Sequence, residues 1–134
     1  MEVNITSHGE EILQLFKTAV IRGLERCGLQ AEGYAIDLVP VDTSTLKQSI
    51  THKVDADEQA AYIGTNNDYA AYVELGTGKY AEGGGGRPTP WVYQDDEGKW
   101  HHTHGQRAQP YLRPALADHK QTYRNILKDE LENA

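Results

Sequence analysis

The chain is poor in the residues that stabilise a small protein from within. Leu, Ile, Val and Phe supply only 26 of its 134 residues, and Phe and Met occur once each. The single cysteine, Cys27, excludes an internal disulfide and any zinc site built on several cysteines. The longest uninterrupted apolar run, residues 69–73, is far short of the roughly 20 residues that span a bilayer. We therefore expect one domain over residues 1–134 with a small core, to which neighbouring subunits add stability.

Positive charge is also scarce, because 20 acidic residues face 13 basic ones and the net charge is −7. This balance excludes the large basic surface that tight binding to DNA or to an anionic membrane needs. The first residues are acidic and polar, so we expect no secretory signal. These features predict a soluble protein that is made in a cytoplasm-like compartment.

The first long pattern predicts a helix over residues 7–38. Ser7 and Glu10 have the spacing of a capping box at the helix start. Apolar residues then recur every three or four positions, which predicts one buried face, and Pro40 ends the pattern. Cys27 lies on this face, which favours an inert core thiol over a nucleophile. The face includes Ile12, Phe16, Leu24, Cys27 and Ala31.

The middle of the chain carries several short elements. Alternation of apolar and polar residues indicates strands, whereas apolar residues at three-four spacing indicate short helices. Aromatic residues on both sides of an acidic turn predict a β-hairpin. The expected elements are a short helix after Pro40, strands at 49–55 and 60–64, a helix at 69–75, and hairpin arms at 91–93 and 99–102.

The chain ends in a second amphipathic pattern, which predicts one helix over residues 111–131. Pro114 is tolerated there only in the first turn, and Leu116 lies on the apolar face. Together the elements predict an α+β fold, with long N-terminal and C-terminal helices packed on a small antiparallel sheet, a long glycine-rich loop and an extended β-hairpin. Substituting Phe16 or Leu116 by Ala is then expected to cost roughly 2–5 kcal/mol of stability.

Residues 76–90 form the glycine-rich segment, with six glycines, two prolines and few apolar side chains. Loops of this length are usually functional or disordered, so we expect this one to be mobile in the isolated subunit. The run from Gly76 to Lys79 is reminiscent of a phosphate-binding loop. However, Val73 stands where that motif needs glycine and Tyr80 where it needs Ser or Thr. Nucleotide binding is therefore not expected.

His101, His102 and His104 form the most suggestive cluster for chemistry, with acidic residues 95–97 across the hairpin. Pairs of imidazoles bind zinc or nickel, but a functional site needs three or four converging ligands. Nothing in the sequence supplies the third, so exposed histidines and a small metal-dependent enzyme remain as alternatives. No nucleophile-elbow motif is present. We assign no catalytic, cofactor-binding or metal-binding residue.

Three segments, in order, resemble a family of phage proteins. They read Val41-Asp42-Thr43-x-x-Leu46-x-x-Ser49-Ile50, then Tyr62-Ile63-Gly64-Thr65 with Tyr69-Ala70-x-Tyr72-Val73-Glu74-x-Gly76-Thr77, then Gly105-Gln106-x-Ala108-x-Pro110-Tyr111-Leu112-Arg113-Pro114-Ala115. With Trp91, Gly98 and Trp100 between them, they look like the signature of tailed-phage neck or tail-completion proteins. This family is typified by the gene-ten product of siphophage HK-ninety-seven. The resemblance extends over residues 5 to 130.

The resemblance implies a non-enzymatic virion protein that joins the DNA-filled head to the tail, as part of a ring around the DNA channel. It also implies other copies of the chain, head-closure or connector proteins, and tail-tube or terminator proteins as partners, with no cofactor and no membrane. DNA would pass nearby without tight binding. The protein would be made in the bacterial host cytoplasm and end in the neck or tail of the virion. The structural alternative is a tail terminator that caps the tail tube.

Within the motifs, several residues have a physical role. We expect Asp42 to cap the short helix and Gly76 to let the chain leave the 69–75 helix. Glu74 and Arg113 either form an ion pair or are separately solvated. The motif residues are Asp42, Thr43, Leu46, Ser49, Glu74, Gly76, Thr77, Pro110, Arg113 and Pro114. The candidates for contact with partners are Lys79, Tyr80, Arg87, Trp91 and Trp100.

Overall fold

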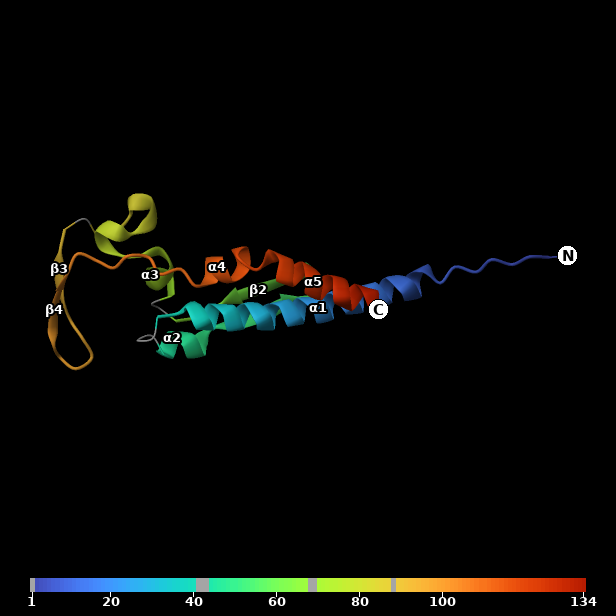
Figure 1. Cartoon of the computed structure of the whole chain (residues 1–134), viewed down its shortest axis with the longest axis horizontal. Coiled ribbons are helices and arrows are strands. Elements are labelled where there is room, and N and C mark those ends of the chain that lie inside the picture. Colours follow the sequence, from blue (N-terminus) through green and yellow to red (C-terminus); the bar gives the residue numbers. More distant parts are fainter. Residues whose placement is uncertain (1, 41–43, 68–69, 88) are drawn as a thin grey trace.

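The computed structural model describes residues 2–40, 44–67, 70–87 and 89–134. The helices and strands form an elongated molecule, and the hairpin β3–β4 lies at the end opposite to the N-terminus (Figure 1). No helix in these ranges is long and apolar enough to cross a membrane. In chain order the elements are α1 (Gly9–Leu38), α2 (Ser44–Ser49), β1 (Thr51–Asp55), β2 (Ala60–Gly64), α3 (Ala70–Leu75), η1 (Gly78–Tyr80), η2 (Glu82–Gly84), β3 (Trp91–Gln94), β4 (Trp100–Thr103), α4 (Leu112–Ala117) and α5 (Lys120–Glu132).

The first helix, α1, runs without a break over the predicted range, but its predicted capping box does not form. His8 is the N-cap residue, and the Ser7 hydroxyl accepts the N–H of Gly9 at 3.2 Å. At the other end Val39 is extended, as the residue before a proline prefers to be, and the helix stops there. The end of α1 before Pro40 is thus confirmed, whereas its first turn is not capped as predicted.

The buried face of α1 is made of small residues. Cys27 is buried as predicted, and its thiol lies 3.6 Å from the carbonyl oxygen of Tyr123 in α5. Burial raises the pKa of this thiol, which suits an inert core residue. The absence of larger side chains lets α5 approach, since a Cβ on Gly23 would collide with Leu127. The buried residues of α1 are Ala19, Gly23, Cys27, Gly28, Ala31 and Ala35.

The first turns of α1 contradict the predicted buried face. Ile12 and Phe16 keep 50% and 46% of their surface exposed. The reason is that α5 ends beside the middle of α1, where Arg26 pairs with Asp129 and Glu130 at 2.9 Å. Burial on α1 begins only at Ala19, and among the described residues the turns before it extend beyond the end of α5 (Figure 1). The expected core cavity in a Phe16→Ala variant is therefore wrong for the isolated subunit.

Strands β1 and β2 pair antiparallel over their whole length and pack on α1. His52 of β1 lies over Gly28, where any Cβ would collide with the imidazole ring. The two ring nitrogens of His52 contact Glu32 at 2.6 Å and Glu25 at 3.1 Å, both on α1. The bond to Glu32, more than any other contact, raises the pKa of His52. One glycine and one ion-paired histidine thus hold the hairpin against the helix.

The core lies where the end of α1 meets α2, α3 and α4. Its largest side chain is Tyr111, which is fully buried and donates its hydroxyl to the carbonyl oxygen of Ala70 at 3.2 Å. This bond satisfies the polar end of an otherwise apolar side chain. The cluster is small, as the scarcity of large apolar residues predicts. Its members are Ala35, Val39, Leu46, Ile50, Tyr111 and Ala115.

The predicted last helix is broken into α4 and α5 at residues 118–119. The hydroxyl of Tyr123 donates to the carbonyl oxygen of Ala115, which is the acceptor that the N–H of His119 would use in a continuous helix. At the same residue, the side chain of His119 contacts α1: its ring stacks on that of Tyr34, with centroids 3.5 Å apart. A tyrosine four residues later therefore interrupts the helix and turns its axis onto α1. Pro114 lies in the first turn of α4, as predicted.

The second hairpin, β3–β4, forms a sheet of its own and does not join β1–β2. It pairs Trp91 with Thr103 and Gln94 with Trp100, which confirms the predicted hairpin. The turn is closed by Asp95, whose carboxylate accepts the N–H of Lys99 at 2.8 Å. The α+β fold with long terminal helices, two small antiparallel sheets and an extended hairpin is thus confirmed.

Candidate partner-binding surface

Glu74, in the last turn of α3, is the charged side chain that the described residues bury, with 7% of its surface exposed. Its carboxylate accepts the backbone N–H groups of Tyr111 at 2.7 Å, Leu112 at 3.0 Å and Arg113 at 3.0 Å. The first N–H groups of a helix have no partner within it, so Glu74 caps α4 from another element. Burial alone would raise the pKa of Glu74, but these bonds and the guanidinium outweigh it and lower the pKa.

Arg113 extends this contact to the glycine-rich segment. Its Nε donates to the Glu74 carboxylate at 2.8 Å and its Nη2 to the Glu74 carbonyl oxygen at 2.9 Å. The ion pair predicted as one alternative is therefore present. The remaining N–H groups hold both carboxylate oxygens of Glu82 in η2, at 2.8 and 3.2 Å. Glu82 is not among the site residues predicted from sequence. The signal that could have identified it is a single acidic residue directly before four glycines.

The first part of the glycine-rich segment is built against residues 104–106. The N–H of Thr77 donates to the carbonyl of Gln106 at 2.9 Å, and the N–H of Lys79 to that of His104 at 3.1 Å. The two backbones cross so closely that a Cβ on Gly78 would meet the carbonyl oxygen of His104. Gly76 has a φ of +82° and ends α3 as predicted. The base of the loop is therefore a packed crossing of two segments.

The rest of the segment has far fewer contacts. A Cβ added at Gly83, Gly84 or Gly85 would meet nothing within 4 Å. Among the described residues, the contact between η2 and α4 is the Arg113–Glu82 ion pair. Gly86, in contrast, approaches the Gly78 carbonyl so closely that a Cβ there would collide with it. Mobility in the isolated subunit stays a prediction, and these contacts direct it to residues 83–85 rather than to the crossing at 76–80.

An open hollow of about 690 Å³ lies between this segment, α3 and the β3–β4 hairpin. Arg87 and Trp91, two of the predicted contact residues, line it, with the guanidinium 5.7 Å from the indole ring. Lys79 and Tyr80 do not line it; the centroid of the Tyr80 ring lies 5.0 Å from Lys79 Nζ and 4.8 Å from the guanidinium carbon of Arg107. Trp100 is 65% exposed on β4. The structure thus brings two of the five candidates together and spreads the others along the same end.

Three of the other motif residues, Leu46, Ser49 and Thr77, stabilise the fold. Asp42 and Thr43 lie outside the described residues, so the predicted cap by Asp42 has no description here. Leu46 is buried in the core, and the Ser49 hydroxyl donates to its carbonyl oxygen at 2.7 Å. The Thr77 hydroxyl accepts the N–H of Gln106 at 2.8 Å and so strengthens the crossing.

The histidine cluster does not converge. His101 contacts the Asp95 carboxylate at 2.6 Å, which lowers the pKa of Asp95. His102 and His104 lie edge to face, with centroids 5.6 Å apart. Within the described ranges, no three His, Cys, Asp or Glu side chains are placed to hold a metal ion. What the geometry of this end offers is a surface for another protein, with aromatic and cationic side chains around a hollow.

Comparison with known proteins identifies the family of the chain. No curated protein matches it, and neither does any solved structure. Residues 6–76 match the model of a family described as "Bacteriophage HK97-gp10, putative tail-component". The match covers α1, the β1–β2 hairpin and α3, and it ends at the glycine that terminates α3. Because it spans more than half of the chain, the protein belongs to the HK97-gp10-like family of bacteriophage tail components.

Proposed function

We propose that this phage tail component joins the DNA-filled head to the tail, as part of a ring around the DNA channel. Family membership supports a structural role in the tail or neck and a place in the virion. The head-side and tail-side neighbours would be a head-closure or connector protein and a tail-tube or terminator protein. The net charge of −7 suits a wall along which DNA slides without binding tightly.

The observation that carries this proposal is the set of exposed apolar side chains at the end of the molecule that bears the β3–β4 hairpin. Val92, Tyr93 and Trp100 are large apolar residues that stay more than 40% exposed there. Exposed apolar patches mark surfaces for other proteins, and aromatic residues are enriched in such interfaces. The crossing at 76–80 and the Glu74–Arg113–Glu82 contacts hold this end in shape without a core of its own. A protein surface presented on a rigid base is what a joint between two particles requires.

The test is complementation of a phage that lacks this gene. Head–tail joining predicts that DNA-filled heads and finished tails of normal length accumulate separately, and that the supplied protein restores joined, infectious particles. A tail terminator predicts tails of abnormal length instead, which electron microscopy distinguishes directly. Normal joined particles without the protein would contradict both roles.

The metal-dependent enzyme is the alternative from another class. It predicts that zinc binds the purified protein tightly and that substituting His101, His102 and His104 together by Ala abolishes binding. Under the joining role, the same triple variant restores joined particles nearly as well as the wild type. Loss of joining that chelation of zinc also reproduces would favour the metal.

A further inference from the structure

The uncovered start of α1 is an amphipathic helix without a partner. Ile12, Leu13, Leu15 and Phe16 keep between 46% and 57% of their surface exposed, and together they occupy one side of the first turns. Polar residues occupy the other side. An isolated stretch of two to three helical turns is marginal in water, and most helices depend on packing of their apolar face. These four residues, here called the apolar start of α1, therefore need a cover that the described subunit does not supply.

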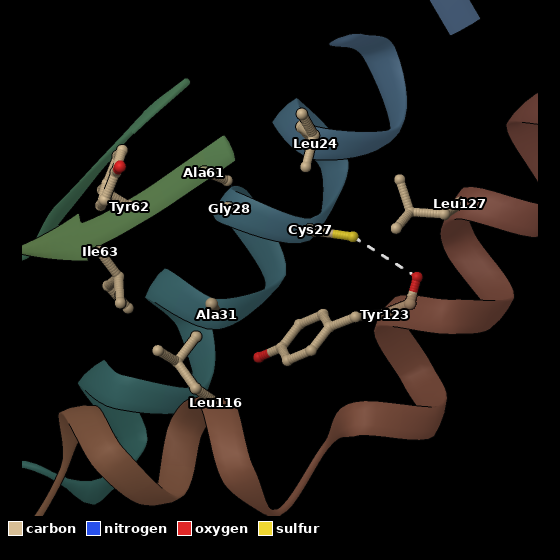
Figure 2. Close-up of a pocket in the computed structure, with 10 residues that line it drawn as sticks. All are labelled: Leu24, Cys27, Gly28, Ala31, Ala61, Tyr62, Ile63, Leu116, Tyr123 and Leu127. Carbon is tan, nitrogen blue, oxygen red and sulfur yellow. Dashed lines mark hydrogen bonds between the residues drawn. The ribbon is translucent and has the colours of Figure 1, made fainter. Parts of the chain in front are cut away.

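A matching apolar cavity lies further along the molecule. It has a volume of about 180 Å³ and opens between β2, α1 and the α4–α5 pair (Figure 2). Small residues of α1, Gly28 and Ala31, form its floor, and larger side chains stand around it. A cavity of about 150 Å³ accepts a benzene ring, so this one has room for the ring of one phenylalanine. Its lining residues include Leu24, Ala61, Tyr62, Ile63, Leu116 and Leu127.

The apolar start of α1 cannot fill the cavity of its own subunit. Both belong to one unbroken helix, and Phe16 precedes the floor residue Ala31 by 15 positions. At about 1.5 Å per residue, the two lie roughly 20 Å apart along a rigid axis. An occupant of the cavity must therefore come from another molecule.

Charge complementarity points to a second copy of this chain. The first turn of α1 is acidic, with Glu10 and Glu11. Across α5, Arg124 follows the cavity-lining Tyr123 directly, and Lys120 lies one turn earlier. Neither cation has an ion-pair partner within the described part of the chain. The acidic start of one helix is thus complementary in charge to two cations on α5, the helix that supplies Tyr123 and Leu127 to the cavity of the next subunit.

We infer that Phe16 of one subunit inserts into the Leu116-lined cavity of the next, so that subunits associate head to tail. The two surfaces differ, so the contact is heterologous, and a heterologous contact closes into a ring when its rotation permits. This inference rests on the ring of the proposed function and names the surfaces that build it. It also explains why Leu116 and Tyr62 stay about half exposed in a protein with few large apolar residues.

The test measures the mass of the purified protein by light scattering, up to about 0.5 mM. We expect the wild type to exceed the subunit mass of 14.9 kDa. Phe16→Glu and Leu116→Glu should each weaken self-association at least tenfold. Leu29→Glu, which places the same charge on a position of α1 that is 63% exposed and lies outside both surfaces, is the matched control and should associate as the wild type does. Circular dichroism checks that each variant folds, and Ala61→Glu replaces Leu116→Glu if that variant does not.

Mixing the variants decides between two contact geometries. In a heterologous contact, Phe16→Glu retains an intact cavity and Leu116→Glu an intact helix start, so an equimolar mixture forms dimers and nothing larger. Dimers of Leu116→Glu alone would mean that helix starts pair with each other and would overturn the inference. A wild type that stays monomeric at the highest concentration would also overturn it, because the cover would then be a different protein.

The outcome is separable from that of the proposed function. If the wild type associates through these surfaces but heads and tails join without it, only the joining role fails. If joining needs the protein but Phe16→Glu associates and complements normally, only the inferred contact fails.

Discussion

The core and the hairpin end of the described molecule are held together by different forces. Where α1 ends, Leu46, Ile50 and Tyr111 pack with almost no exposed surface, and hydrophobic burial stabilises the structure. At the hairpin end, no buried cluster of large side chains occurs among the described residues. That end is held by backbone hydrogen bonds across the 76–80 crossing and by the carboxylates around Arg113.

Because of this difference, the core determines the stability of the molecule, whereas the hairpin end determines the shape of the proposed partner surface. The core responds to changes in volume, whereas the hairpin end responds to changes in charge and backbone conformation. Glu74 lies between the two, since it caps α4 beside the core and holds Arg113 on the other side. The surface proposed to contact partners can therefore be altered with little effect on folding, provided that Glu74 is kept.

The largest effect is expected in the core. Leu46→Ala removes a side chain with 2% exposure and leaves a cavity, so the free energy of unfolding should fall by roughly 2–5 kcal/mol. Urea denaturation measures the change. Val92→Ala at the hairpin, where the side chain is 57% exposed, is the control and should cost less than about 0.5 kcal/mol. Equal losses in the two variants would contradict the division between core and hairpin end.

A smaller effect is expected at the residue that links the ends. Glu74→Gln keeps the shape but removes the charge that three backbone N–H groups and Arg113 share, so unfolding should become easier by about 2 kcal/mol. Glu82→Gln weakens an exposed contact with the same Arg113, which solvent screens, and should cost clearly less than Glu74→Gln. A loss in Glu82→Gln as large as in Glu74→Gln would mean that the ion pair, and not the cap, matters.

The same pair of variants predicts a pH dependence. The pKa of Glu74 is lowered in the folded state, so its contribution is present above the unfolded pKa, near 4.5, and is lost as pH falls through the folded value. The stability gap between wild type and Glu74→Gln should therefore be constant at neutral pH and shrink below about pH 4.5. A gap that stays constant down to pH 2 would show that the charge of Glu74 plays no part.

Much of the fold was predictable because it follows local patterns. Periodicity, Pro40 and Gly76 set the ends of α1 and α3, and the acidic turn set the β3–β4 hairpin. The break between α4 and α5 was not predictable, since it depends on a side chain bond from Tyr123 that competes with the helix. The exposure of Phe16 was missed for a related reason: a periodic pattern identifies an apolar face but not whether the same chain covers it.

The candidate surface was predictable only in part. The pairing of Glu74 with Arg113 was one of two alternatives, because two charged residues 39 positions apart give no local signal of contact. The role of Gly78 at the crossing depends on a close approach of residue 104, which only the tertiary structure shows. Leu116 was predicted to be buried, but 47% of its surface is exposed. The predicted core cavity at Leu116 is therefore wrong for the isolated subunit.

His52 allows a test of the contact between the β1–β2 hairpin and α1, which lies outside the hydrophobic core. Its folded pKa is raised, chiefly by Glu32, so its contribution is present below the unfolded pKa, near 6.5, and is lost as pH rises through the folded value. The wild type should thus lose roughly 1 kcal/mol relative to His52→Gln between pH 6 and pH 9. Thermal melts at several pH values measure this. A difference that is independent of pH would mean that the imidazole stays neutral and acts through packing alone.

The smallest effect on stability, with the largest expected effect on function, concerns residues 83–87. Replacing them by a short Gly-Ser link that keeps a glycine where Gly86 approaches the Gly78 carbonyl preserves the Glu82–Arg113 pair and the crossing at 76–80. The other replaced glycines, Gly83, Gly84 and Gly85, have open space around them. Loop closure changes by only about 0.6 kcal/mol per doubling of length, so the unfolding midpoint should hardly move.

If this segment contacts a partner in the joint, infectivity should nevertheless collapse, with filled heads and finished tails left apart. A scrambled segment of the same length and composition separates sequence from length, because it retains the reach of the loop but moves Arg87 away from Trp91. Normal titres from the shortened protein would mean that the partner surface is the hairpin alone. A shortened protein that no longer folds would mean that residues 83–87 contribute to stability. The distinction between a core that determines stability and a hairpin end that determines the partner surface would then be wrong for this segment.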